Sequence, residues 1–161
     1  MSKEQVKERL RSYLCLKFET ENQLERLLRL KSEEKFPAMR ESSGAKQSGS
    51  PEGRMEKAII RRMEYEASVM PKIEAAQKEM EQIEDAISAV RDPMEREVLR
   101  LRYVDGENCR PMLWRDVAAQ LYGDDDERHI LATYRLHGRA LTSISKEQLF
   151  AEEVNYESDT V

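Results

Sequence analysis

The residues best suited to chemistry in this sequence are basic ones near its C-terminal end. Residues 128–146 contain four arginine or lysine residues and no acid. Both residue types neutralise phosphates, and an arginine can also hydrogen-bond a guanine base in bidentate fashion. This composition indicates a modest basic face, although a solvated helix surface has a similar composition.

The average charge of the chain hides this basic segment. The 161 residues sum to −5, from 27 basic and 32 acidic side chains. Residues 147–161 hold five acids and no base, so residues 1–146 sum to zero (−5 + 5). The acidic total therefore does not exclude nucleic acid as a partner, because the distribution of charge matters more than its sum.

No motif typical of an enzyme is present. The sequence has no glycine-rich phosphate loop, no GxSxG and no HExxH. His129 and His137 lie eight residues apart without a nearby cysteine, which is a poor spacing for zinc. We therefore expect a chain that is not an enzyme and that holds no metal and no cofactor.

The sequence also gives an expectation about location. No apolar run approaches the roughly 20 residues that span a membrane. The first residues, "MSKEQVKERL", lack the apolar core of a signal peptide. We expect a cytoplasmic chain with no membrane partner.

Residues 3–35 predict a first long helix, because apolar residues recur at steps of three and four. The apolar stripe consists of Val6, Leu10, Tyr13, Leu14, Leu24, Leu27 and Leu28. Pro37 ends this helix. Residues 40–53 are rich in serine and glycine without a periodic apolar pattern, which predicts a flexible connection.

A second long helix is predicted to begin near Met55, and its later part carries a heptad pattern. The seam positions are Val69, Ile73, Ala76, Met80, Ile83, Ile87 and Val90. Such a narrow seam faces a partner helix. Pairing with the first helix of the same chain is favoured, while self-association or a coiled coil with another protein stays open. Pro71 predicts a kink or a break near Met70.

The third predicted helix begins with a capping box. Asp92 is the expected N-cap, Pro93 the first helical residue and Glu95 the acid that completes the box. Gly106 is the expected stop, in the left-handed conformation. The helix should expose Arg96, Arg100 and Arg102, and its apolar side should be Met94, Val98, Leu99 and Leu101.

Two further helices follow. "WRDVAAQLYG" predicts a short helix with Trp114, Val117, Ala118 and Leu121 facing inward. One of Asp124, Asp125 and Asp126 should cap a last helix over residues 127–145. Its inner face should be Ile130, Leu131, Leu136, Ala140, Leu141 and Ile144. Small residues on the shorter helix permit a close crossing, so the pair has the pattern of a helix-turn-helix.

The predicted fold class is all-α, with an N-terminal helical hairpin or coiled coil followed by a helix-turn-helix bundle. The expected domains are a first long helix (1–37), a flexible linker (38–54), a second long helix that pairs with the first (55–91), a helix-turn-helix domain (92–146) and an acidic tail (147–161).

Residues 92–144 resemble region 4 of sigma factors of the sigma-70 type. The similarity lies in "DPMEREVLRLRYVDG", "WRDVAAQLYG" and "YRLHGRALTSI". A closer similarity is to sigma-like regulators of phages and prophages of Firmicutes, in the ArpU and RinA style. The matching positions are Arg102, Tyr103, Gly106, Trp114, Val117, Ala118, Arg135, His137, Ala140 and Leu141.

The sequence departs from this family in two places. The loop "ENCRPML" is longer than the family's link between glycine and tryptophan. The segment "GDDDERHILAT" is longer than the turn expected before a recognition helix, and its three aspartates would repel nearby phosphates. They either cap the helix and point away from DNA, or they weaken DNA binding.

The resemblance implies a transcriptional regulator in a bacterial host cell that binds double-stranded promoter DNA through its last helix and contacts host RNA polymerase. The outward candidates for DNA contact are Arg128, Thr133, Tyr134, Arg135, His137 and Arg139. One alternative is a helical interaction protein that binds polymerase or another factor without reading DNA. Another is a phage DNA-packaging subunit. The promoter, the direction of regulation and the oligomeric state do not follow from the sequence.

Overall fold

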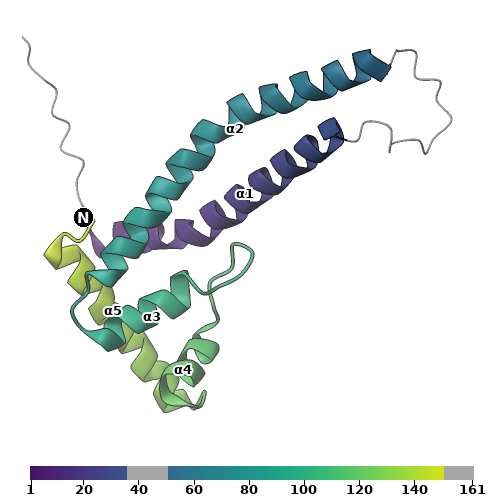
Figure 1. Cartoon of the computed structure of the whole chain (residues 1–161). Coiled ribbons are helices and arrows are strands. Elements are labelled where there is room, and N and C mark those ends of the chain that lie inside the picture. Colours follow the sequence, from purple (N-terminus) through teal and green to yellow (C-terminus); the bar gives the residue numbers. More distant parts are fainter. Residues whose placement is uncertain (36–50, 151–161) are drawn as a thin grey trace, which may run out of the picture. The chain divides into compact units, whose positions relative to one another are not determined.

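The computed structural model describes residues 1–35 and 51–150, and within them the chain folds into five α-helices (Figure 1). The predicted all-α class is confirmed. Most of the predicted linker and most of the acidic tail lie outside the described residues. The helices are α1 (Lys3–Lys35), α2 (Pro51–Ser88), α3 (Pro93–Tyr103), α4 (Trp114–Tyr122) and α5 (Glu127–Glu147).

The chain divides into two compact units that differ from the predicted domains. The bundle unit consists of Met1–Leu16 and Glu79–Val161, and the two-helix unit is Lys17–Lys78. Both long helices thus contribute to both units. The prediction placed boundaries at prolines and at changes of composition, whereas packing groups the start of α1 and the end of α2 with the three short helices.

The core of the bundle unit combines all five helices. From α1 it takes Val6, Leu10, Tyr13 and Leu14, and from the end of α2 and the residues after it Ile83, Ala86, Ile87 and Val90. The short helices and the residue that follows them add Val98, Leu99, Leu101, Tyr103, Val117, Leu136, Ala140, Leu141, Ile144 and Phe150. Burial of these side chains supplies the main stabilisation of the bundle.

Polar contacts also join the start of α1 to α2 in the bundle unit. The Arg9 guanidinium donates from Nε and Nη2 to both carboxylate oxygens of Glu79, at 2.6 and 3.0 Å. It also donates to Gln82 Oε1 at 2.5 Å. A bidentate pair of this kind fixes orientation as well as distance. The predicted pairing of the two long helices therefore has a polar counterpart within one chain.

The N-terminus of α3 is capped by Asp92, as expected. Its Oδ1 accepts hydrogen bonds from the backbone N–H of Met94 at 2.8 Å and of Glu95 at 3.4 Å. The reciprocal half of the predicted capping box is wrong. The buried carboxylate of Glu95 instead accepts a hydrogen bond from Ser143 Oγ at 2.7 Å, and so links α3 to α5.

Gly106 does not act as the predicted left-handed stop. Helix α3 ends before it, with Val104 as a right-handed C-cap. Glycine is required at 106 because an added Cβ would lie 2.3 Å from the Arg110 carbonyl oxygen and 2.6 Å from Leu14 Cδ1. The next residues make a tight turn in which Asn108 and Cys109 both have positive φ, as two-residue hairpin turns of type I′ require.

The two-helix unit has a smaller apolar contact surface. Leu27 of α1 and Val69 and Ile73 of α2 are buried. The Arg62 guanidinium binds the carboxylates of Glu34 at 2.9 Å and Glu66 at 2.8 Å. Contact with these carboxylates raises the pKa of Arg62, so its charge is permanent.

Two expectations for the long helices need correction. Leu24 and Leu28 were placed on the buried stripe, yet they are 41% and 68% exposed. Their assignment to the buried stripe is wrong, because Leu27 is the only one of these three leucines that is buried. Helix α2 runs through Pro71 without the predicted break, and it begins at Pro51 rather than near Met55. The milder alternative, a kink, stays a prediction.

Candidate nucleic-acid interface

Helix α5 has one buried side and one basic side. Its buried residues are Thr133, Leu136, His137, Ala140, Leu141 and Ile144. The basic stripe consists of Arg128, Arg135, Arg139 and Lys146, all exposed. Steps of seven, four and seven residues bring all four onto one face of a helix with 3.6 residues per turn. The helix therefore presents its positive charges together.

Three members of the basic stripe are available to a ligand. Among residues 1–35 and 51–150, no carboxylate lies within ion-pair distance of Arg135, Arg139 or Lys146. Arg128 is 86% exposed and its Nε lies 3.2 Å from Asp126 Oδ2. An exposed pair of this kind is weak, so it can exchange its partner at little cost.

Tyr134 lies at the border between the basic stripe and α4. Its side chain is 46% exposed, as expected for a contact residue. Its ring meets Trp114 edge-on, with centroids 5.1 Å apart. Trp114 itself is half-buried and packs against the core, which agrees with the predicted inward face of α4. The contact with Trp114 limits the freedom of Tyr134 while leaving its edge accessible.

Thr133 was predicted to face outward, and this is wrong. Its side chain is fully buried, and its hydroxyl donates to the backbone carbonyl of His129 at 2.8 Å. A threonine in this rotamer satisfies its hydroxyl within its own helix, so it fits an apolar interior. Thr133 therefore has no atom to offer to DNA.

His137 was also predicted to face outward, and this too is wrong. It is 8% exposed and its Nε2 lies 2.7 Å from the Tyr103 hydroxyl. Burial, helped by the positive charges of Lys7, Arg102 and Arg11, lowers the pKa of His137 to about 4. The ring is neutral at pH 7, and it belongs to the core between α3 and α5.

The arginines of α3 are mostly engaged by the protein itself. Arg102 is half-buried, donates to the Met112 carbonyl, and its guanidinium lies 4.3 Å from the centre of the Trp114 ring. Burial lowers its pKa. Its predicted outward orientation is wrong, because Trp114 and the loop before it cover it. Arg96 donates to the Val90 carbonyl at 2.7 Å, which anchors the connection between α2 and α3.

Arg100 is the exposed member of the α3 set. Its guanidinium is held between the carboxylates of Glu97 at 2.5 Å and Asp105 at 3.0 Å. These carboxylates raise the pKa of Arg100, with the hydrogen bond that Arg100 donates to Glu97 as the main cause. The arginines of α3 are thus largely engaged within the protein, and the positive charges available to a ligand lie on α5.

The turn between α4 and α5 contains a glycine that ends α4 and an aspartate that stands at the N-cap of α5. Gly123 takes the left-handed conformation (φ 87°) and its N–H bonds the Ala119 carbonyl, which ends α4. Asp126 is the N-cap residue of α5, but its side chain makes no capping hydrogen bond. The predicted side-chain cap is therefore absent, because the Asp126 carboxylate turns to Arg128 instead.

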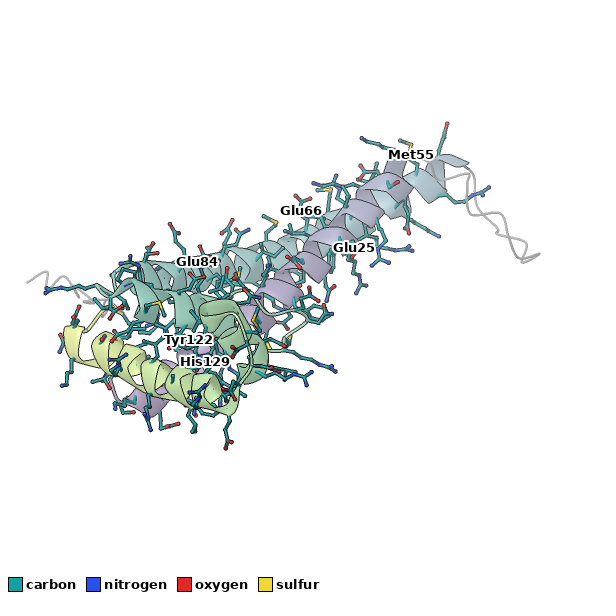
Figure 2. All side chains as sticks on the ribbon, turned by 90° about the horizontal axis from the view of Figure 1, so that it is seen from below. Glu25, Met55, Glu66, Glu84, Tyr122 and His129 are labelled. Atoms are coloured by element: carbon teal, nitrogen blue, oxygen red, sulfur yellow. The ribbon has the colours of Figure 1, made fainter. Side chains whose placement is uncertain are left out.

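Asp124 organises the rest of this turn. Its Oδ1 accepts the backbone N–H of Asp126 at 3.1 Å and also contacts His129 Nδ1. The hydrogen bond from His129 is the main cause that lowers the pKa of Asp124. The His129 ring stacks on Tyr122, with centroids 5.0 Å apart (Figure 2). Asp124 and Asp126 thus both contact side chains of the first turn of α5, and the ion pair with Arg128 reduces the repulsion of phosphates by Asp126.

Leu131 was assigned to the inner face of α5, and this is wrong. Its side chain is 48% exposed and takes no part in the core. The side chains assigned inward at Leu136, Ala140 and Leu141 are buried as expected. Residue type misled the assignment, because threonine and histidine occupy the buried positions of the first turns while a leucine faces out.

Comparison of the chain with protein-family models, curated proteins and solved structures finds no match. The resemblance to sigma-like regulators therefore stays a prediction carried by the residues quoted above. Within residues 1–35 and 51–150, every helix is too short or too polar to cross a lipid bilayer.

Proposed function

We propose that this protein is a DNA-binding transcriptional regulator of phage or prophage genes that acts through the sigma-like helix-turn-helix of α4 and α5. The basic stripe of α5 is the observation that carries this proposal. Four exposed positive charges lie on one helix face, and three of them have no carboxylate partner in the described part of the chain. A helix of this kind fits a DNA major groove.

The packing of α4 on α5 supports the same function. Val117 and Ala118 of α4 are fully buried, and α4 packs against α5. The small Ala118 side chain permits a close crossing, while the opposite face of α5 stays open to solvent. From Arg128 to Lys146 the stripe extends for about 27 Å at 1.5 Å per residue. It can thus reach phosphates on both sides of a groove about 12 Å wide.

The test is binding to duplexes that the protein itself selects from a random-sequence pool, measured by fluorescence anisotropy at several salt concentrations. We expect affinity to fall steeply with salt, because each neutralised phosphate contributes about 0.9 to the slope of log K against log salt. Replacing Arg135 and Arg139 together by alanine should reduce that slope by about 2. The same double variant should bind at least tenfold more weakly at the lower salt concentrations.

A matched control removes two arginines elsewhere in the bundle unit. Arg91 and Arg110 are exposed and lie outside α5, so Arg91→Ala with Arg110→Ala makes the same change in net charge. This control should keep the wild-type salt slope. An equal loss in both double variants would mean that only total charge matters, and the assignment of α5 as the DNA-contacting helix would then be abandoned.

A second candidate function is a helical interaction protein that binds RNA polymerase without reading DNA. The observation in its favour is an apolar surface beside the basic stripe, where Leu113 is 55% and Tyr134 is 46% exposed next to Trp114. Capture of purified bacterial RNA polymerase, together with no binding to any selected duplex, would support this candidate over the first.

A further inference from the structure

Leu131 is an exposed leucine within the basic stripe. It follows Arg128 by three residues and precedes Arg135 by four, and its side chain is 48% exposed. At about 100° per residue, it lies roughly 60° around the helix axis from Arg128 and roughly 40° from Arg135. The three side chains therefore leave α5 on the same side.

The packing of the bundle does not account for this leucine. Leu131 belongs neither to the buried core of the bundle unit nor to the half-buried side chains that pack against that core. The other large exposed apolar side chain of α5, Tyr134, has a partner in Trp114. A single exposed leucine is ordinary on a protein surface. Leu131 differs from an ordinary exposed leucine because it lies between two exposed arginines on the same side of the helix.

We infer that Leu131 reads the 5-methyl group of a thymine in the major groove, an inference that rests on the proposed DNA-binding function. Thymine is the only DNA base that presents a methyl group there, and apolar side chains are its usual contacts. Leu131 lies about 4.5 Å along the helix from Arg128 and about 6 Å from Arg135. These spacings are one to two base steps of 3.4 Å.

This arrangement predicts a target site of defined composition. Arg128 and Arg135 contact phosphates or guanines, and Leu131 faces a thymine within one or two base pairs of each contact. Covering one methyl group is worth roughly 0.8 kcal/mol, which corresponds to about fourfold in affinity. The leucine thus adds selectivity for one base to a binding energy that comes mainly from charge.

The test replaces each thymine of a selected duplex in turn by deoxyuridine, which keeps every hydrogen-bonding group and lacks only the methyl. For the wild-type protein, one such replacement should weaken binding about fourfold. Leu131→Ala should bind the thymine and deoxyuridine duplexes equally well. Leu28→Ala removes a leucine that is 68% exposed in the two-helix unit, and it should keep the fourfold difference.

Three results would overturn the inference, and they are distinguishable. Equal binding of every deoxyuridine duplex by the wild-type protein shows that no methyl group is read. A fourfold difference that survives in Leu131→Ala shows that another side chain reads it. If the wild-type protein binds no duplex, both the proposed DNA-binding function and the inference about Leu131 are wrong. Because Leu131 is outside the core, its alanine variant should melt at the wild-type temperature, which separates loss of recognition from loss of folding.

Discussion

A buried histidine gives the bundle unit a defined response to acid. Burial raises the pKa of the Tyr103 hydroxyl to about 12, so the hydroxyl keeps its proton and can donate it to Nε2 of the neutral His137 ring. Protonation of His137 would place a second positive charge beside Arg102 in the same core. The folded state therefore favours the neutral ring, whereas the unfolded chain protonates it near pH 6.5.

This preference predicts how stability changes with pH. Above pH 6.5 the ring is neutral in both states, and the contribution of His137 is fully present. As the pH falls from 6.5 to about 4, only the unfolded chain takes up the proton, so the free energy of unfolding should fall by up to about 1.4 kcal/mol per pH unit. Urea denaturation at pH 7, 6, 5 and 4.5 measures this loss.

The variant His137→Gln isolates the effect from the titration of carboxylates. Glutamine can still hydrogen-bond the Tyr103 hydroxyl, and it does not titrate. The variant should therefore lose less stability on acidification than the wild-type protein. Parallel curves for wild-type protein and His137→Gln would show that His137 is accessible to protons in the folded state.

At the scale of the helices, the helix ends were predicted well where nearby residues in the sequence determine them. The bounds of α1 and the Asp92 cap of α3 follow from residues within a few positions, so the sequence contains the information. The role of Gly106 was only partly predictable: one constraint is the nearby Arg110 carbonyl, but the other is the close approach of Leu14 to Gly106, 92 residues apart in the chain. Only the folded bundle brings these two residues together.

The orientation of α5 illustrates the same limit for the candidate site. Arg128, Tyr134, Arg135 and Arg139 are exposed as predicted, because charge and size keep them out of a small core. Thr133 and His137 are buried because each finds a hydrogen-bond partner, the first in its own helix and the second in Tyr103 of α3. Apolar periodicity cannot detect a polar residue that is buried with its partner.

The close approach at Gly106 predicts a strong response to a single methyl group. In Gly106→Ala, the new methyl group would push both the Arg110 carbonyl and the Leu14 side chain away from residue 106. Overpacking of this kind costs about 1–3 kcal/mol. Gly138→Ala is the matched control, because a Cβ at this position in α5 meets nothing within 4 Å. It should stabilise the protein by roughly 0.5–1 kcal/mol through helix propensity. Thermal denaturation measures the stability of both variants. A Gly106→Ala variant as stable as the wild-type protein would contradict the close approach at residue 106.

At the scale of the whole molecule, the bundle unit gathers residues from both ends of the described chain. The Ser145 hydroxyl donates to the carbonyl of Met1 at 2.6 Å. Phe150 is 6% exposed in the core, and the Arg9 guanidinium lies 4.2 Å from its ring centre. Residues 147–161 were predicted as an acidic tail, yet Phe150 within them is part of the fold. The tail prediction relied on charge alone and so missed one aromatic anchor.

Phe150 should therefore determine the stability of the bundle unit although it follows the last helix. Phe150→Ala removes a buried aromatic ring, which typically costs about 3–5 kcal/mol, and it also leaves Arg9 without its aromatic contact. Phe18→Ala, at a phenylalanine that is 40% exposed in α1, should cost less than about 1 kcal/mol. Chemical denaturation followed by Trp114 fluorescence reports on the bundle unit directly, because Trp114 is the only tryptophan in the chain. If both variants unfold at the same denaturant concentration, Phe150 does not hold the core, and the bundle unit would be complete at the end of α5.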